Sequence, residues 1–97
     1  MLFHITHVHD EKTCPGNNEE VFSKTFGIVL DTLEEHLNEV IGAWMDPVGH
    51  TSFFVVDADE SSQIFSGLFP IVDAGTAKIQ PVGDYAAMLK MRKELNS

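Results

Sequence analysis

The sequence has little positive charge. Six Lys and Arg residues stand against fifteen Asp and Glu residues, which gives a formal net charge of −9. Proteins hold a phosphate backbone or an anionic membrane with clustered Lys and Arg, and no such cluster occurs before residue 90. We therefore expect neither nucleic acid nor a membrane to be a partner.

The sequence also has only one cysteine and no long apolar run. Cys14 has no second cysteine with which to form an internal disulfide, which is usual for proteins of a reducing compartment. No apolar stretch approaches the roughly 20 residues of a membrane helix. The first residues lack the basic flank and small-residue cleavage site of a secretion signal. These features predict a cytoplasmic protein.

The residues that are present indicate one small globular domain over residues 1–97. Hydrophobic residues make up 43% of the chain and charged residues 22%, an ordinary balance for a domain of this size. A chain this short has a modest core, so burial against a second copy would add to its stability.

Hydrophobic periodicity divides the chain into strands and helices. Residues 2–8 alternate between apolar and mainly polar side chains, which predicts a strand. From Phe22 to Leu37 the apolar residues recur every three or four positions, which predicts one amphipathic helix of about five turns. The later segments are a hairpin over 40–45 and 50–58, a helix stopped by Pro70, a strand over 76–82 and a short final helix.

Turn and capping residues agree with these boundaries. Asn17 and Glu20 resemble a capping box, the run Asp57-Ala58-Asp59-Glu60 offers aspartate caps for the second helix, and Asp84 caps the last. The run Asp46-Pro47-Val48-Gly49 has the residues of a type I turn.

The order β-α-β-β-α-β plus a terminal helix is that of the ferredoxin-like fold. We predict an α+β protein with a four-stranded antiparallel sheet, helices on one face and a short C-terminal helix. With the opening MLFHITHVH…CP, the hairpin AWMDPVGHTSFFVVDADE and the closing IQPV, the chain resembles the dimeric α/β-barrel superfamily. That superfamily includes muconolactone-isomerase-like proteins and antibiotic-biosynthesis monooxygenases. The resemblance covers residues 1–83 and implies a homodimer whose two sheets enclose a pocket.

The alternation of the first strand assigns its side chains to two faces. Phe3 and Ile5 are large and purely apolar, so we expect them to face the helices. The intervening side chains then face the cleft between the two sheets; they are Leu2, His4, Thr6 and Val8. For the third strand the sequence leaves two assignments open, because Thr51, Phe53 and Val55 compete with Ser52, Phe54 and Val56 for each face.

His4 and Thr6 are the first candidates for a functional pair. A histidine can exchange a proton near neutral pH and can act as a general acid or base in an apolar cleft. Thr6 can orient a substrate oxygen beside it. The alternative is a histidine whose nitrogens are satisfied by neighbouring backbone or hydroxyl groups. The candidate ligand-binding residues around the pair are Leu2, Val8, Trp44, His50 and Phe54.

A second grouping consists of His7, His9 and His50. His7 and His9 lie two apart on the first strand, and antiparallel pairing brings His50 toward the same end of the sheet. Three imidazoles, with Asp10 or Cys14 near by, can hold zinc or another divalent ion. A pair of histidines two apart is common by chance. We therefore favour solvated histidines at the rim and expect no metal or other cofactor.

Together these features predict a homodimer that binds a small apolar or aromatic molecule between facing sheets. Three classes of function remain open. The first is an isomerase or a cofactor-independent oxygenase with His4 as the proton-transfer group. The second is a non-catalytic small-molecule sensor. The third is a metal-binding protein that uses His7, His9 and His50.

Overall fold

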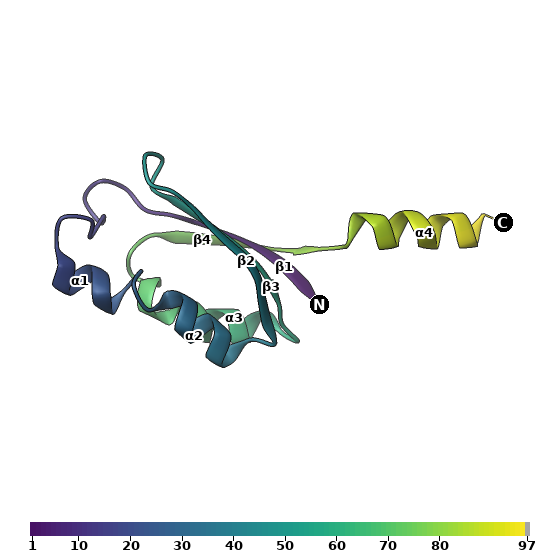
Figure 1. Ribbon diagram of the computed structural model, residues 1–97, viewed down its shortest axis with the longest axis horizontal. Coiled ribbons are helices and arrows are strands. Elements are labelled where there is room, and N and C mark those ends of the chain that lie inside the picture. The colour runs from purple at the N-terminus through teal and green to yellow at the C-terminus, as the bar shows by residue number, and fades with distance from the viewer. Residues whose placement is uncertain (97) are drawn as a thin grey trace.

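The computed structural model describes residues 1–96. Four strands form one antiparallel sheet in the order β2-β3-β1-β4. The elements are β1 (Leu2–Val8), α1 (Glu19–Lys24), α2 (Val29–His36), β2 (Glu39–Asp46), β3 (Thr51–Asp57), α3 (Ser61–Leu68), the 3-10 helix η1 (Phe69–Ile71), β4 (Thr76–Val82) and α4 (Tyr85–Leu95). The predicted ferredoxin-like α+β fold is confirmed. Helices α2 and α3 lie together on one side of the sheet (Figure 1).

The first helical region differs from the prediction of a single helix. Helix α1 ends at Lys24 and α2 begins at Val29. Thr25 breaks the helical backbone with φ −121 and ψ −96, and its hydroxyl bonds back to the carbonyl of Val21 at 2.8 Å. Thr25 and Gly27 are both weak helix formers, so the apolar spacing continues across a break that it cannot reveal.

The helix caps are shifted from two of the predicted positions. Asn18, rather than Asn17, caps α1 by accepting a hydrogen bond from the amide of Val21 at 3.1 Å. Glu60, rather than an aspartate, is the N-cap of α3 and forms a reciprocal capping box with Gln63. Asp84 caps α4 as predicted, by accepting from the amide of Ala87.

The two faces of the sheet differ in what covers them. Phe3, Ile5 and His7 of β1 are buried against the helices, whereas the intervening Leu2, His4, Thr6 and Val8 are partly or fully exposed. The assignment predicted for β1 is therefore confirmed. We call the side of the sheet away from α2 and α3 the open face.

The face of β3 is settled by its register with β1. Phe54 pairs with Ile5, and Phe53 pairs with Thr6. Directly paired residues share a face, so Phe54 lies on the helix side, where it is buried. The placement of Phe54 in the cleft was wrong, and Phe53 takes that position on the open face.

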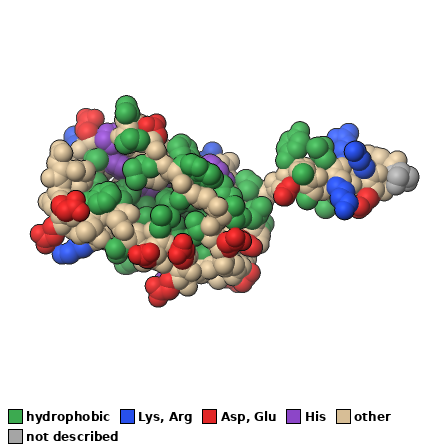
Figure 2. All heavy atoms as spheres, in the orientation of Figure 1, with side chains coloured by type: hydrophobic (Ala, Val, Ile, Leu, Met, Phe, Trp, Pro, Cys, Tyr) green, Lys and Arg blue, Asp and Glu red, His purple; other side chains and the backbone are tan. Residues whose placement is uncertain are grey.

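Helix α4 extends away from the rest of the chain (Figure 1). Among the described residues, no strand or other helix packs extensively against it. Its apolar side chains are consequently exposed, including Tyr85, Met88, Leu89 and Leu95. Figure 2 shows a group of basic side chains on the projecting helix and acidic side chains along the edge of the body. No helix in residues 1–96 has the length and apolar character needed to cross a membrane.

Candidate functional site

The open face carries His4 and Thr6 side by side at its centre. The Thr6 hydroxyl oxygen lies 3.5 Å from Nδ1 of His4, at the limit of a hydrogen bond. The His4 ring centroid is 6.3 Å from that of Phe53, with the planes tilted by 42°. An imidazole, a hydroxyl and an aromatic ring therefore share one half-buried surface.

Apolar side chains from the other strands surround this pair. Trp44 pairs with Phe53 across β2 and β3, and Leu2 and Val8 flank the pair on β1. The Trp44 indole covers Gly42, because a Cβ at that position would overlap the ring. Even so, Trp44 remains 59% exposed. Of the seven residues predicted for the site, the structure brings Leu2, His4, Thr6, Val8 and Trp44 onto this one face.

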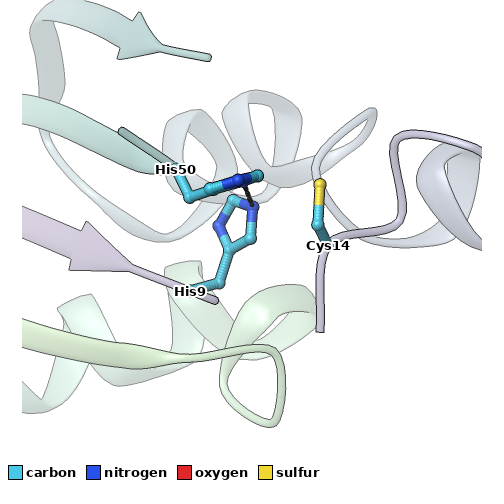
Figure 3. Close-up of side chains that lie close together, drawn as sticks. All are labelled: His9, Cys14 and His50. Carbon is cyan, nitrogen blue, oxygen red and sulfur yellow. Dashed lines mark hydrogen bonds between the residues drawn. The ribbon is translucent and has the colours of Figure 1, made fainter. Parts of the chain in front are cut away.

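A second group of side chains lies at one end of the sheet. His9 follows β1, His50 lies in the connection between β2 and β3, and Cys14 lies in the loop before α1 (Figure 3). Nδ1 of His50 is 3.3 Å from Nε2 of His9. One ligand atom from each of the three residues lies within 4.8 Å of the other two. We call His9, Cys14 and His50 the rim cluster.

Backbone contacts hold the rim cluster in place. The amide of His9 donates to the carbonyl of His50 at 3.0 Å, which ties the end of β1 to the hairpin. Asp10 then shapes the next turn, where its Oδ1 accepts from the amides of Lys12 and Thr13 at 2.9 Å each. These hydrogen bonds, above all those from Thr13, lower the pKa of Asp10. The Asp10 carboxylate is thus committed to its own turn and lies outside the cluster.

His50 occupies a costly backbone conformation. Its φ of 50 is the only positive φ at a non-glycine residue in the described chain. A side chain in this left-handed region costs about 1–2 kcal/mol, so glycine is the usual choice. The preceding turn is held by Asp46, whose Oδ1 accepts from Val48 and Gly49. The chain places an imidazole where a glycine would be less strained, a pattern that is concentrated at functional sites.

The environment of His9 favours a neutral imidazole. Burial lowers its pKa, and the neighbouring rings of His50 and His7 lower it further, while Asp10 acts in the opposite direction. A neutral imidazole retains a lone pair that can bind a metal or accept a proton. Its other nitrogen, Nδ1, is buried with no hydrogen-bond partner among the described residues.

His7 does not belong to the rim cluster, although the sequence grouped it with His9 and His50. It is 1% exposed. In the central strand β1 it pairs with Ser52 of β3 on one side and with Ala77 of β4 on the other. Its Nε2–H donates to the carbonyl of Ile71 at 3.0 Å. The predicted set of three histidines was wrong in this member, because its ring is turned toward η1. Cys14 lies in its place beside His9.

Apolar walls surround the rim cluster. A cavity of about 200 Å³ is lined there by the cluster and by Pro15, Phe22, Phe26, Met45 and Pro47, among others. The Phe26 ring lies 5.0 Å from that of His9, centroid to centroid. Apolar surroundings of this kind limit water access and strengthen polar interactions inside the site.

Comparison with known proteins assigns the chain to a family. Residues 1–96 match the family described as "Domain of unknown function (DUF3303)". The chain belongs to the DUF3303 family. Among solved structures it is similar to protein Atu4242 from Agrobacterium tumefaciens, with 14% sequence identity and a TM-score of 0.48. That match covers 88% of this chain and 96% of the other. No curated protein matches the chain significantly.

This DUF3303 chain therefore has two separate groups of reactive side chains. His4 and Thr6 occupy the open face of the sheet, and the rim cluster occupies its end on the helix side of β1. The sequence located the first group by alternation along one strand. For the second group it named Asp10 and Cys14 as alternatives near the histidines and did not choose between them, because the path of the loop from residue 10 to residue 16 follows no periodic pattern.

Proposed function

We propose that the protein acts as a homodimer of the dimeric α/β-barrel type, which binds a small apolar or aromatic molecule between two open faces. One observation carries this proposal: the open face presents apolar side chains around a His–Thr pair, and neither α2 nor α3 covers it. Exposed patches of this kind usually mark an interface or a ligand site. Pairing two such faces about a two-fold axis would bury on the order of 1,500 Å².

Helix α4 supports the same assembly. Its apolar side chains find no cover within the described chain, and a second copy would provide it. The helix carries three of the six basic residues, Lys90, Arg92 and Lys93, whereas fourteen of the fifteen acidic residues precede it. A weakly basic helix is thus complementary in charge to the acidic body of a partner.

His4 gives the enclosed space a possible chemistry. In the enzyme form of the proposal, His4 accepts a proton from a substrate carbon. An isomerase returns this proton to another carbon, whereas a cofactor-independent oxygenase leaves the carbanion to react with dioxygen as the co-substrate. Thr6 holds a substrate oxygen beside it. In the sensor form the same residues bind the ligand without turnover. Product analysis after incubation with the ligand separates the two forms.

The dimer is tested by sedimentation at low micromolar concentration. We expect a mass of two chains for the wild type and of one chain for Phe53→Glu, which places a charge on the open face. Val48→Glu is the matched control, because Val48 is 88% exposed in the hairpin turn. It should leave the dimer intact. A folded wild-type monomer at this concentration would refute the dimer.

The pocket is tested with N-phenyl-1-naphthylamine, an uncharged aromatic probe whose emission rises in apolar surroundings. Trp44 is the only tryptophan of the chain, so energy transfer from its indole reports that the probe has bound, and the Phe53→Glu variant tests whether it binds at the open face. We expect saturable binding with quenching of Trp44 emission, and weaker binding by Phe53→Glu. Equal binding by both proteins would contradict a pocket between the sheets.

A further inference from the structure

We infer that His9, Cys14 and His50 form a binding site for one divalent transition-metal ion, with zinc as the test ion. The ligands would be Nε2 of His9, Nδ1 of His50 and the Cys14 thiolate. This site is independent of the open face, and it corrects the set of three histidines that the sequence indicated. Each of the next three observations bears on it separately.

The first observation is the distance between the two imidazoles. Tetrahedral zinc has Zn–N bonds of about 2.0–2.1 Å, which places two nitrogen ligands about 3.3–3.4 Å apart. Nδ1 of His50 and Nε2 of His9 are already 3.3 Å apart. With a Zn–S bond of about 2.3 Å, the sulfur should lie about 3.6 Å from each nitrogen. A ligand atom of Cys14 lies within 4.8 Å of both, so a shift of no more than about 1 Å brings the sulfur to this distance.

The second observation is that the two ring nitrogens face each other within an apolar cavity. Without a metal the two rings share one hydrogen bond, so one nitrogen carries a proton and only the other offers a lone pair. When Nδ1 of His9 and Nε2 of His50 carry the protons instead, both facing nitrogens present lone pairs to the space between the rings. A cation in that space binds both lone pairs at once.

The third observation is the backbone of His50. The chain keeps φ at 50 for this residue, although glycine or asparagine would fill that conformation with less strain. The conformation turns Nδ1 toward His9. A ligand that requires an imidazole at this position accounts for the strained choice.

The donor set indicates the class of metal. Two imidazoles and one thiolate suit zinc and its neighbours, and do not suit calcium or magnesium, which prefer oxygen ligands. Binding would release the Cys14 thiol proton to solvent, so affinity should rise with pH. Three protein ligands leave the fourth position to water or a small anion, which is the arrangement of open rather than closed zinc sites.

The test uses the full chain, reduced, freed of metal with a chelator and without a histidine tag. Cobalt(II) is titrated first, because a thiolate ligand produces a charge-transfer band in the near ultraviolet. We expect this band to saturate at one equivalent and to disappear when zinc displaces the cobalt. Absence of the band, or saturation without thiolate absorption, would overturn the site.

Three variants identify the ligands. Cys14→Ser should abolish the charge-transfer band, and His9→Gln and His50→Asn should each weaken zinc binding by about 100-fold or more, since even supporting residues of metal sites cost 10–100-fold. Asparagine is chosen at position 50 because it tolerates the left-handed backbone. The control is His36→Gln on the exposed surface of α2, which should bind zinc like the wild type.

A second measurement does not depend on the variants. In ¹H–¹⁵N spectra of the wild-type chain, one equivalent of zinc should shift the amides of residues 9, 14 and 50 and their neighbours. Amides at the centre of the open face should not move. Shifts confined to the acidic surface, or zinc affinity unchanged in the variants, would refute the inference. The proposed dimer would be unaffected by either result.

Discussion

At the scale of single residues, His7 shows how a polar ring can lie within an apolar layer. It continues the row of Phe3 and Ile5 on the helix side of β1. One nitrogen donates to the carbonyl of Ile71, but Nδ1 is buried without a partner among the described residues. Burial lowers the pKa of His7, and the hydrogen bond to Ile71 only partly offsets this effect. The folded protein thus holds His7 as a neutral imidazole.

This environment predicts a loss of stability in acid. The pKa of His7 in the unfolded chain is near 6.5, and in the folded chain it is lower. As the pH falls from about 6.5 toward the folded pKa, the unfolded chain binds a proton that the folded chain does not. The free energy of unfolding should therefore fall over this range, by at most about 1.4 kcal/mol per pH unit for one proton. Urea unfolding of the metal-free protein at fixed concentration measures it.

Two variants separate His7 from the other titrating groups. His7→Gln keeps an N–H that can donate to Ile71 but cannot be protonated, so its stability should fall less steeply with decreasing pH. His36→Gln removes an exposed histidine and should retain the wild-type slope. Equal slopes for all three proteins would show that His7 is not responsible.

The backbone strain at His50 predicts a trade-off between the stability of the fold and the affinity for metal. In the metal-free protein, His50→Gly should raise the free energy of unfolding by about 1 kcal/mol, because glycine adopts a φ of 50 without strain. The same variant should bind zinc much more weakly than the wild type. Thermal unfolding with chelator and with added zinc measures both effects. A variant that is less stable than the wild type with chelator present would contradict the strain.

Sequence reasoning at this scale succeeded where the pattern was unambiguous. In β1, Phe3 and Ile5 mark the helix side, so the open face follows by alternation. In β3, the run Phe53-Phe54-Val55-Val56 offers the same residue types to both faces. Only the pairing of Phe54 with Ile5 decides between them, and register is a property of two strands rather than of one.

At the scale of elements, the contact between α2 and α3 depends on one glycine. Gly67 is buried, and a Cβ at this position would lie 2.8 Å from Cδ2 and 3.2 Å from Cα of Leu33. The Gly67 carbonyl also accepts a hydrogen bond from the hydroxyl of Thr32 at 2.6 Å. The two helices approach closely because position 67 carries no side chain.

Gly67→Ala should accordingly destabilise the fold. Alanine favours a helix by about 1 kcal/mol over glycine, but overpacking against the backbone of Leu33 should outweigh this gain. We expect a net loss of roughly 1–2 kcal/mol. Ser66→Ala is the control, since Ser66 is exposed on the same helix and should gain a few tenths of a kcal/mol. Urea unfolding measures the free energy of unfolding of both variants, and we expect the m-value to stay unchanged. A Gly67→Ala variant that is more stable than the wild type would contradict the close contact.

The order of the elements was predictable because periodicity, turn residues and caps agreed along the chain. The break between α1 and α2 was not, since Phe22, Phe26 and Val29 keep helical spacing across it. The rim cluster was predictable only in part. His9 and His50 meet by strand pairing, whereas Cys14 reaches them through a loop shaped by Asp10 and Thr13.

At the scale of the whole molecule, α4 is the part that the single chain leaves without cover. It projects beyond the sheet and gives the chain a longest dimension of 58 Å, against 27 and 16 Å in the other directions. A short helix in isolation is marginally stable, because most helical stability in proteins comes from packing of an apolar face. We expect that packing to come from a second copy.

Leu89→Glu should then weaken the dimer. Glutamate is a good helix former, so the change removes an apolar contact without disrupting α4. We expect the dimer dissociation constant to rise about 10-fold, which corresponds to about 1.4 kcal/mol. Sedimentation equilibrium measures it, with Val48→Glu as the charge-matched control. An unchanged dissociation constant would exclude Leu89 from the interface.

The two edges of the sheet bear on how copies of the protein can meet. Edge strand β2 has a bulge between Val40 and Gly42, and edge strand β4 contains Pro81, which has no N–H to donate. Natural sheets use such interruptions to prevent the endless strand-to-strand addition that produces amyloid fibrils. Both edges of the sheet thus disfavour the addition of a strand from another copy. Association through the faces of the sheet is not hindered in this way. In the proposed dimer each open face is covered by the other, so we expect even crowded solutions to contain discrete particles and no filaments.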